Sequence, residues 1–373
     1  MSKYEELVKQ LCPDGVEYKR VSDVCDISRG QVMSKDYIKE NAGDYPVYSS
    51  QTENNGELGK INTYMYDGEY LTWTTDGANA GTVFYRTGKF SVTNVCGLLK
   101  VTTPLLLVKF LYYTLSVEAP KYVSSGMGNP KLMSNVMGRI KVPVPPVTVQ
   151  EEIIKKLDVF ANLVNELKIE LDARKKQYNE LSYQLLRKNN NAPLYSVGEF
   201  CELSKGKTPI QKAEAGEYPL VVTTSERKSC NTYQYDTTAV CVPLVSSRGH
   251  GVASLNHVYY QEGKFALGNI LCAVVPKDTT LLSAKYLYFY FECTKDYTLV
   301  PLMKGGANMS MHIPDIEKVK IPVPDIETQR SIVSKLEILD EYCNVVLPAE
   351  IEARQKQYEY YRDKLLTFKE ASE

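Results

Sequence analysis

The run "VPVPPVTVQEEIIKKL" (residues 142–157) returns in changed form as "IPVPDIETQRSIVSKL" (residues 321–336). The second run follows the first by 179 positions in a chain of 373 residues, so each half of the chain contains one copy. Farther along, "ARKKQYNELSYQLL" (173–186) matches "ARQKQYEYYRDKLL" (353–366) at an offset of 180, which places one inserted residue in the second copy. A repeat of this length predicts two copies of one fold.

Each run leads into a long helical pattern. Apolar side chains alternate spacings of three and four residues, as in a helix that packs against another helix. The first helix is predicted over about residues 149–187, a length of roughly 55 to 60 Å. In the second, Pro348 is expected to kink or interrupt the helix because it lacks an N–H. We expect an antiparallel coiled-coil pair with pseudo-twofold symmetry, and a helix-pair core that includes Leu157, Leu167, Leu336 and Leu339.

The segments before the two helices are rich in β-branched and aromatic residues punctuated by Gly and Asn, a pattern typical of domains built on sheets. Residues 81–94 and 257–267 each consist of two extended stretches around a Gly, which predicts a hairpin. Residues 105–116 and 281–293 predict short helices with apolar faces. The chain is therefore predicted to be α+β, with similar globular domains at residues 1–146 and 191–324 and spacer helices at residues 147–190 and 325–373.

Composition narrows the possible functions. Hydrophobic residues make up 43% and charged residues 24%, values typical of a soluble globular protein, and no apolar run approaches the roughly 18 to 20 residues of a membrane span, so a cytoplasmic location is expected. Nine scattered cysteines without a CxxC pair argue against a disulfide framework or a zinc site. The net charge of −1 means that any nucleic-acid binding must depend on local clusters of Lys and Arg.

Motifs of catalysis are missing from the sequence. Its three histidines stand in no Ser-His-Asp or Cys-His order, and there is no P-loop and no Asn/Asp-Pro-Pro-Tyr motif of an amino-methyltransferase. The "GMG" at residues 126–128 and the "GHG" at residues 249–251 lack the third glycine and the strand-helix context of a dinucleotide site. The chain is therefore expected to bind rather than to catalyse.

The Pro-rich entry with its Gln and long helix occurs twice, each time after a globular segment, and "YYRDKLL" (360–366) stands near the C-terminus. In these features the sequence resembles the DNA-specificity (S) subunits of type I restriction-modification systems. The resemblance covers nearly the whole chain.

This resemblance implies a function. Each globular segment would be a target-recognition domain that reads one half of a split site on double-stranded DNA, and the helices would hold the two readers apart. The helices would also dock two copies of the methyltransferase (M) subunit, and the restriction (R) subunit would join through that complex. S-adenosylmethionine and ATP would belong to those partners, so this chain would be non-catalytic and would hold no cofactor or metal.

Candidate DNA contacts are the residue types that can reach bases or phosphates from loops. Bidentate Arg, Asn or Gln and small hydroxyls suit base edges, and Lys, Arg and backbone N–H groups suit phosphates. In the first domain the candidates are Arg29, Gln31, Ser49, Ser50, Gln51, Thr74, Thr75, Asp76, Asn129 and Lys131. In the second they are Lys205, Lys207, Thr223, Thr224, Ser225, Arg227, Ser246, Ser247, Arg248, His250, Lys304 and Asn308. The Gly-rich stretch "SSGMGNPK" (124–131) and its counterpart "KGGANMS" (304–310) are favoured among them.

Three interpretations stay open at this point. Candidate contact residues could simply be solvated loops, and the chain could be a helical scaffold or adaptor whose globular domains never touch DNA. It could also be an enzyme of a type that its motifs do not reveal. The salt dependence of duplex binding separates the scaffold or adaptor from a DNA-binding subunit, because phosphate contacts release counterions and give a steep negative slope.

Overall fold

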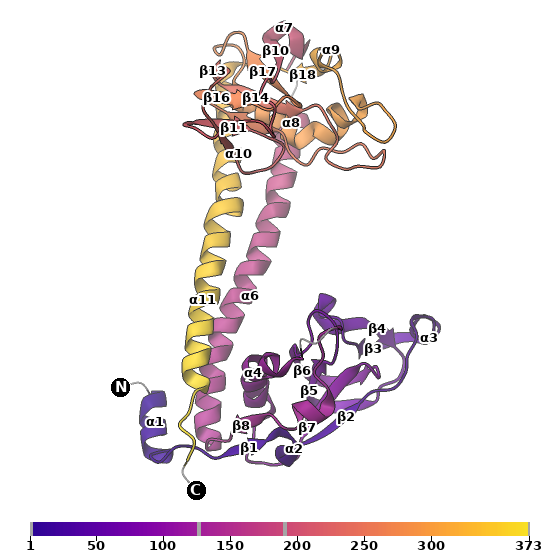
Figure 1. The fold of residues 1–373 in the computed structure, drawn as a ribbon, viewed down its shortest axis with the longest axis vertical. Helices are drawn as coiled ribbons and strands as arrows, with labels where there is room; N and C mark the ends of the chain where they lie inside the picture. Colours follow the sequence, from indigo (N-terminus) through magenta and orange to yellow (C-terminus); the bar gives the residue numbers. More distant parts are fainter. Residues whose placement is uncertain (1–2, 125–127, 189–191, 372–373) are drawn as a thin grey trace. The chain divides into compact units, whose positions relative to one another are not determined.

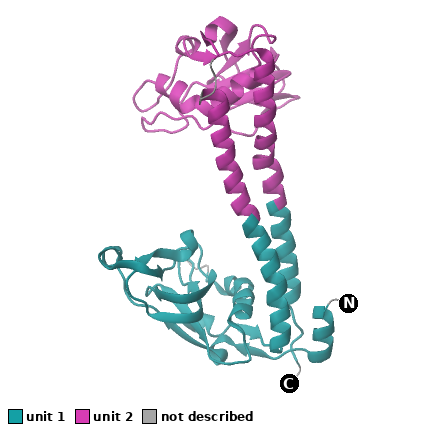
Figure 2. Cartoon of the chain, turned by 180° about the vertical axis from the view of Figure 1, so that it is seen from behind, with its two compact units in different colours: residues 1–166, 351–373 teal, residues 167–350 magenta. Residues whose placement is uncertain are grey.

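The structure is a computed structural model and describes residues 3–124, 128–188 and 192–371. It divides into two compact units (Figure 2). Unit 1 consists of Met1–Glu166 and Ile351–Glu373, and unit 2 of Leu167–Glu350. Each unit thus combines one predicted globular domain with adjoining parts of both long helices, and both ends of the chain belong to unit 1.

Unit 1 is built on a six-stranded sheet with the order β2-β7-β5-β6-β3-β4, in which only β3 and β6 pair in parallel (Figure 1). The strands are β2 (Cys25–Arg29), β3 (Ala42–Tyr48), β4 (Glu57–Ile61), β5 (Tyr66–Thr74), β6 (Val83–Val92) and β7 (Cys96–Val101). The other elements are α1 (Lys3–Leu11), β1 (Tyr18–Arg20), α2 (Val21–Val24), α3 (Lys35–Glu40), η1 (Glu53–Gly56), α4 (Val108–Glu118), η2 (Ala119–Tyr122), α5 (Ser134–Met137) and β8 (Lys141–Pro143). Helix α4 packs Phe110 and Leu111 into the core formed with Leu71 and Trp73.

Unit 2 carries the same strand order in two pieces. Its sheets are β10-β17-β14-β15 and β12-β11-β16-β13. The strands are β10 (Cys201–Lys205), β11 (Tyr218–Val221), β12 (Lys228–Cys230), β13 (Tyr235–Asp236), β14 (Ala239–Pro243), β15 (Tyr259–Gln261), β16 (Lys264–Leu267) and β17 (Leu271–Pro276). Its further elements are η3 (Gln184–Lys188), β9 (Leu194–Ser196), α7 (Val197–Phe200), α8 (Ala284–Thr298), η4 (Val300–Leu302), α9 (Ile313–Glu317), β18 (Lys320–Pro322), α10 (Ile326–Glu341) and η5 (Tyr342–Val346). If β13 and β14 are taken as one strand and β15 and β16 as another, the order matches unit 1.

Both predicted hairpins are wrong. In unit 1, β6 continues through Gly88, whose φ is 78°, and pairs along its length with β5. In unit 2, Gly263 at φ 74° separates β15 from β16, but β15 pairs with β14 while β16 pairs with β11 and β13. Gly263 lets the chain bend onto new partners, whereas the strand at Gly88 keeps the same partner on both sides. A left-handed conformation is accessible to Gly without strain at both positions. The predicted short helices are present as α4 and α8, and the α+β class is confirmed.

The repeated Pro-rich run has the same structural role in both units. Strand β8 pairs with β1 in unit 1, and β18 pairs with β9 in unit 2, both antiparallel. Gln150 and Gln329, which follow these strands, are fully buried. Gln150 Nε2 donates to the carbonyls of Leu105 and Pro145, both at 2.7 Å, and its Oε1 accepts from the N–H of Leu107 at 2.8 Å.

Gln329 makes the same three bonds, to the carbonyls of Leu281 and Pro324 and from the N–H of Ser283, all at 2.8 Å. These amides fix the entry to each long helix against the loop that leads into α4 or α8. The repeated sequence therefore forms the same hydrogen-bonded junction at the start of the long helix in both units.

Helix α6 (Val147–Tyr183) and helix α11 (Leu347–Leu366) lie side by side and antiparallel in unit 1. The rings of Phe160 and Tyr361 stack with centroids 5.1 Å apart, and Leu157 is fully buried. Helix α1 covers the same end, since Tyr4 Oη donates to the carbonyl of Leu365 at 3.3 Å. Leu157 thus belongs to the core of unit 1 that also holds Leu365.

In unit 2, α6 packs against α10 and η5. Tyr342 Oη donates to Glu170 at 3.4 Å, and Leu336 is fully buried in the unit's main core. Leu167 and Leu339, predicted to lie in the helix-pair core as well, are only half-buried. A pair of helices without a third leaves the flanks of its seam open to solvent, which accounts for the exposure of these two leucines.

The one-residue insertion of the second copy is absorbed as a π-helical turn. Residues Tyr342–Val346 are π-helical, and the N–H of Leu347 bonds to the carbonyl of Tyr342 five residues earlier. Such turns arise when one residue is added to an α-helix. Pro348 follows directly, and the widened turn removes the clash that its ring would make with a carbonyl four residues back.

Among the described residues, no helix is long and apolar enough to cross a membrane.

Candidate nucleic-acid interface

Three loops of unit 1 contact one another beside the C-terminal end of strand β5. The first follows β3 and contains Ser49 and Ser50, the second follows β5 and begins with Thr75, and the third is the turn between β6 and β7. The hydroxyls of Ser50 and Thr75 both donate to the carbonyl of Val95, the latter at 2.7 Å. Thr93 Oγ1 donates to Ser49 Oγ at 3.1 Å. The turn therefore ties the other two loops together.

The described part of the predicted Gly-rich stretch joins the same cluster. Lys131 forms an antiparallel bridge with Asp76, and the N–H of Leu132 donates to the carbonyl of Thr75 at 2.8 Å. Trp73 anchors this loop from inside the core, since its indole N–H donates to the carbonyl of Leu132 at 2.9 Å. Positions 125, 126 and 127 of the stretch lie outside the described residues.

The chain after β2 also contacts this group of loops. Gln31 forms a parallel bridge with Thr93, and its carbonyl accepts from the N–H of Asn94 at 2.9 Å. Arg29 ends β2 with an exposed side chain, and its Nε donates to Ser134 Oγ at 3.4 Å. Five separate segments are thus gathered in one place.

The predicted contacts of unit 1 differ in exposure. Exposed side chains are those of Arg29, Gln31, Gln51, Asn129 and Lys131, and half-buried ones are those of Ser49, Ser50 and Asp76. The side chains of Thr74 and Thr75 are 1% and 2% exposed. The prediction that these two threonines present their hydroxyls to a ligand is therefore corrected, because β5 continues through Thr74 and the turn with Val95 covers Thr75.

A buried arginine holds the loop after β3 in place. Arg86, on β6, is 2% exposed; its Nε donates to Thr72 Oγ1 at 3.1 Å and its Nη2 to the carbonyl of Asn55 at 2.8 Å. Its guanidinium also lies 3.6 Å from the centroid of the Tyr48 ring. Burial lowers the pKa of Arg86 from its ordinary value near 12.5, and the neighbouring Tyr48 and Cys96 partly oppose this. A guanidinium remains protonated in proteins, so the group is a buried cation.

Unit 2 forms the corresponding loop cluster after β14. The N–H of Ser246 donates to the carbonyl of Met309 at 2.9 Å, and the N–H of Gly251 donates to the carbonyl of Ala307 at 3.1 Å. Ser246 Oγ accepts from the backbone of Arg248 and of Ser254 at 3.2 and 3.1 Å. These bonds place the loop at residues 246–254 beside the loop at residues 304–310.

The tips of these two loops are polar and open to solvent. Ser247, Arg248, His250, Lys304 and Asn308 are exposed, and Ser246 is half-buried. His250 has φ 62°, a left-handed conformation that is uncommon outside Gly. Of the two stretches that the sequence analysis favoured, the one at residues 304–310 lies in unit 2, beside the loop at residues 246–254.

The remaining candidates of unit 2 lie on two other segments. Thr223, Thr224 and Ser225 follow β11 and are exposed, with Arg227 half-buried behind them. Lys205 and Lys207 are exposed where β10 ends, and Gln234 accepts from the N–H of Lys207 at 2.9 Å. In the sequence repeat, Thr223 and Thr224 stand at the places of Ser50 and Gln51, and the two lysines at those of Arg29 and Gln31.

In unit 2, Arg227 also joins a candidate loop to a strand, as Arg86 does in unit 1, but here the arginine belongs to the loop and its partner to the strand. Arg227 lies on the loop, and its Nε donates to Gln261 Oε1 on β15 at 3.0 Å. Gln261 stands at the place of Arg86 in the repeat. Sequence reasoning missed Arg86 and Gln261 because a polar residue inside a strand gives no signal of its partner.

The chemistry of both clusters suits recognition. Each offers hydroxyls, amides and a few cations at loop tips, the groups that hydrogen-bond base edges and phosphates. Across the described residues no group of three or more His, Cys, Asp or Glu could hold a metal ion. All nine cysteines are free, and burial raises the pKa of Cys96 to about 11, so its thiol stays protonated at neutral pH.

Comparison with known proteins places the chain in a family. The model of the type I restriction modification DNA specificity domain matches residues 13–173 and again residues 191–353. A Mycoplasma pneumoniae protein that bears the name of a type I specificity subunit is 34% identical over 360 residues, which cover 93% of this chain and 96% of that protein. The specificity subunit of the type I restriction enzyme MpnII of the same organism is 46% identical over 162 residues, covering 42% of this chain and 49% of that subunit.

Solved structures share the fold at low sequence identity. The S subunit of a type I restriction-modification system from M. genitalium aligns with a TM-score of 0.61 at 15% identity, over 94% of this chain and 96% of that one. A chain from a study of complex assembly and conformational transition in the type I R-M system aligns with a TM-score of 0.59 at 15% identity, over 95% and 98%. The two family-model matches cover most of the chain, one in each half. The chain belongs to the type I restriction modification DNA specificity family.

Proposed function

We propose that this chain is the sequence-reading subunit of a type I restriction-modification complex and that it recognises a target made of two separated half-sites on double-stranded DNA. Each unit supplies one reading surface: the loops after β3 and β5 in unit 1, and those after β11 and β14 in unit 2. The observation that carries this proposal is the repeat itself. One strand order occurs twice in the chain, and in each copy the polar loop after β5 or β14 is bridged to the loop at residues 128–132 or 304–310.

In this proposal the long helices set the spacing of the two half-sites. Helix α6 runs without a break for 37 residues, beginning in unit 1 and ending in unit 2. At about 1.5 Å per residue its length is about 55 Å, which exceeds the roughly 34 to 36 Å between half-sites one duplex turn apart. A continuous helix is stiff, so it suits the function of a spacer.

The chemistry of modification and cleavage belongs in this proposal to other subunits. The chain docks two copies of the methyltransferase subunit, which carry S-adenosylmethionine, and the ATP-dependent restriction subunit joins through them. The chain itself positions DNA and holds no cofactor. The complex acts in the cytoplasm, where the cellular DNA is.

A first test measures duplex binding as a function of salt. A DNA-reading subunit loses affinity steeply as salt rises, because each neutralised phosphate releases counterions. The exposed cations Arg248 and Lys304 contribute to that slope, and replacing each by Gln lowers it by about one. Binding without salt dependence, or no binding, supports the alternative of a scaffold that never touches DNA.

A second test lengthens the spacer. Three heptads added to α6 after Glu166 and to α11 before Ile351 keep the seam in register and add about 32 Å, close to one duplex turn. We expect the preferred target to keep both half-sequences and to gain about nine or ten base pairs between them. The matched control substitutes exposed residues at the same two positions without changing the length, and its target stays that of the unmodified chain.

A further inference from the structure

Three residues other than glycine have a left-handed backbone conformation in the described part of the chain, and all three lie at the tips of candidate loops. They are Asn54 and Asn55 in unit 1, at φ 48° and 53°, and His250 in unit 2, at φ 62°. Such conformations are strained for residues with a Cβ, and they concentrate where a protein binds a ligand. The two neighbouring asparagines therefore mark a functional part of the loop after β3.

This loop is longer than its counterpart in unit 2. Fifteen residues separate Tyr45 from Ile61, which pair across β3 and β4, whereas eleven separate Tyr218 from Cys230, which pair across β11 and β12. The difference of four residues equals the length of η1, the turn that contains both asparagines. A feature that only one unit has is suited to bases that only one half-site contains.

The side chains at the base of the loop are already bonded within the chain. Ser50 and Gln51 donate to backbone carbonyls of neighbouring segments. Thr52 Oγ1 accepts from Asn79 Nδ2 at 2.8 Å. These side chains shape the loop, and the exposed side chains at its tip, residues 53–55, are left to meet a ligand.

A buried cation supports the tip from inside the unit. The Arg86 side chain is 2% exposed, and its Nη2 donates to the carbonyl of Asn55 at 2.8 Å. Its guanidinium lies 3.6 and 4.5 Å from the ring centroids of Tyr48 and Phe84. Burial of a cation is unfavourable in itself, and an exposed loop adds no buried surface in return. A contact made by the tip explains why the chain maintains this support.

The tip has the chemistry of a base reader and not of a phosphate contact. The side chains of Glu53, Asn54 and Asn55 are exposed and include no cation. An asparagine amide presents a donor and an acceptor side by side, which match the N7 and the N6 amino group of adenine in the major groove. A carboxylate is repelled by phosphates but can accept from the amino group of cytosine.

The spacing of the two asparagines suits neighbouring base pairs. Adjacent Cα atoms are about 3.8 Å apart, and stacked base pairs are about 3.4 Å apart. Both residues have left-handed φ and ψ, and the bond from Arg86 to the carbonyl of Asn55 fixes the second of them. A loop held in its binding conformation loses little conformational entropy when it binds.

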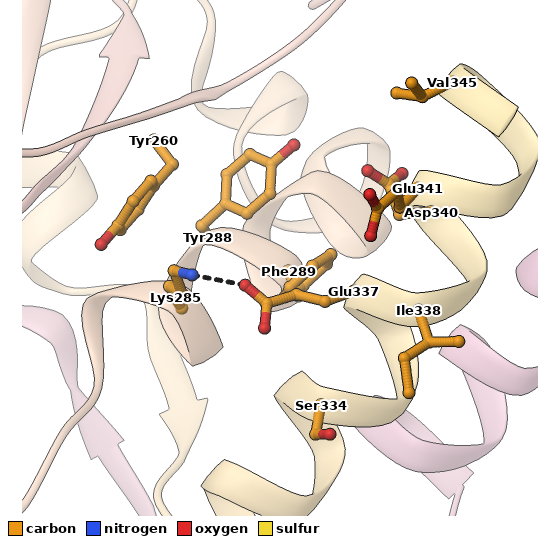
Figure 3. A pocket seen from close by; sticks show the side chains of 10 residues that line it. All are labelled: Tyr260, Lys285, Tyr288, Phe289, Ser334, Glu337, Ile338, Asp340, Glu341 and Val345. Carbon is orange, nitrogen blue, oxygen red and sulfur yellow. Dashed lines mark hydrogen bonds and ion pairs between the residues drawn. The ribbon is translucent and has the colours of Figure 1, made fainter. Parts of the chain in front are cut away.

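The open hollow beside α10 in unit 2 has a different chemistry. Its volume is about 600 Å³, and Lys285 on its wall already pairs with Glu337 (Figure 3). Asp340 and Glu341 add further carboxylates to the lining. Because carboxylates repel a phosphate backbone, this hollow is unsuited to DNA, and a change there serves as a control for unit 2.

We propose that Asn54 and Asn55 read two adjacent adenines in the half-site that unit 1 recognises, each amide donating to the N7 and accepting from the N6 amino group of one adenine. This inference rests on the proposed function and deepens it, because it assigns bases to named side chains. Unit 2 lacks the four additional residues, so the contact belongs to one half-site only.

Glycine variants remove each amide and keep the loop. Glycine adopts the left-handed conformation without strain, so N54G and N55G retain the backbone and lose the side chain. The full chain is assembled with its methyltransferase subunit, and bound duplexes are selected from a library of random sequence. We expect the unmodified chain to select two adjacent adenines in one block and each variant to lose the preference at one of them. The affinity of each variant for the target of the unmodified chain should fall about tenfold.

A base analogue separates the reading of adenine from a loosening of the loop. 7-Deazaadenine keeps its Watson–Crick pair but has carbon in place of N7. At one of the two adenine positions, it should weaken binding by the unmodified chain and have no further effect on the variant that lacks the facing amide. Equal weakening of that variant by the analogue would contradict the inference.

Two controls accompany these variants. N62G alters an exposed asparagine directly after β4, outside the loop, and E341Q alters the hollow of unit 2. Both should select the target of the unmodified chain with unchanged affinity.

The outcomes separate this inference from the proposed function. If N54G and N55G select the unmodified target with unchanged affinity, the inference is wrong, while DNA reading by the chain stands. Equal relaxation of every position in the half-site by either variant would contradict the assignment of single bases. If the unmodified chain selects no target, the proposed function itself fails.

Discussion

The guanidinium of Arg86 donates a hydrogen bond of 2.8 Å to the backbone carbonyl of Asn55 and so fastens the loop after β3 to strand β6. Asn54 and Asn55 both have positive φ, of 48° and 53°, so this loop has a tight conformation that needs support from outside. Unit 2 obtains the same fastening with Arg227 on the loop and Gln261 on the strand. Both units therefore hold a candidate reading loop rigid through a guanidinium.

Replacing Arg86 by Met should loosen that loop. The carbonyl of Asn55 and the hydroxyl of Thr72 would lose their donor inside the domain, which costs about 2 kcal/mol of the unfolding free energy of unit 1. Trp73 is the chain's only tryptophan and lies in the core of unit 1, so its fluorescence during urea unfolding reports this loss. A transition unchanged from that of the unmodified chain would contradict the fastening role.

The same variant should alter one half of the DNA target. A loosened loop reads its bases less strictly, so R86M should relax the preference in the half-site that unit 1 reads and leave the other half unchanged. R227M serves as the matched variant and should have the converse effect. Equal relaxation of both halves by either variant would show that the arginines act on overall stability and not on loop position.

Gln150 and Gln329 should matter more for stability than their position near a surface loop suggests. Each satisfies three backbone groups at a buried joint, so replacement by Leu leaves those groups unpaired and should cost about 2 to 3 kcal/mol. Q150L should shift the Trp73 unfolding transition to lower urea, and Q329L, in unit 2, should not. Q355L on the exposed side of α11 is the control and should change stability by less than about 0.5 kcal/mol.

Deleting Val345 should test why the second helix contains a π-turn. The deletion converts the turn to regular α-helix and places the proline ring against a carbonyl four residues back, which costs up to about 3 kcal/mol. Combining the deletion with P348A removes the clash and should restore the melting temperature measured by circular dichroism. If the deletion is harmless with the proline still present, the π-turn has no role in accommodating it.

Asp340 should make unit 2 less stable at neutral than at acid pH. Burial raises its pKa above the ordinary 3.8, so the unfolded chain releases this proton at lower pH than the folded chain does. The contribution is fully present below about pH 3.8 and is lost as pH rises through the raised pKa. D340N should therefore be more stable than the unmodified chain at pH 7, by less than about 1 kcal/mol because the group is half-exposed.

The comparison is made by thermal unfolding at pH 7 and at pH 3.5, where the difference between D340N and the unmodified chain should vanish. E341Q, at an exposed neighbour, is the control. Greater stability of the unmodified chain at pH 7 would contradict the direction of the pKa shift.

Much of the fold was predictable because it is encoded locally and twice. The heptad spacing from Ile153 onward predicts α6, and the repeated Pro-rich run predicts where each long helix begins. The hairpins predicted at Gly88 and Gly263 were wrong for a physical reason. A glycine between two extended stretches has the same local pattern whether the chain folds back on itself or bends onto another strand, and only distant partners decide between the two.

The candidate site was predictable in outline only. Residue type and position after a strand selected loops that do meet, such as those of Ser50 and Lys131. The same criteria also selected Thr74 and Thr75, whose burial depends on where β5 ends and what covers it. The sequence analysis also missed that Tyr85, Lys109 and Tyr112 return as Tyr260, Lys285 and Tyr288 at offsets of 175 or 176, a signal that alignment of the two halves could have shown.

Recognition of two half-sites by this chain is measured directly by selection of bound duplexes from a library of random sequence, using the chain assembled with its methyltransferase subunit. Two reading surfaces on one spacer require that the selected duplexes share two blocks of defined sequence, separated by a constant number of unspecified base pairs. A single block, two blocks at variable separation, or no enrichment over the starting library would contradict recognition of two half-sites at a fixed separation.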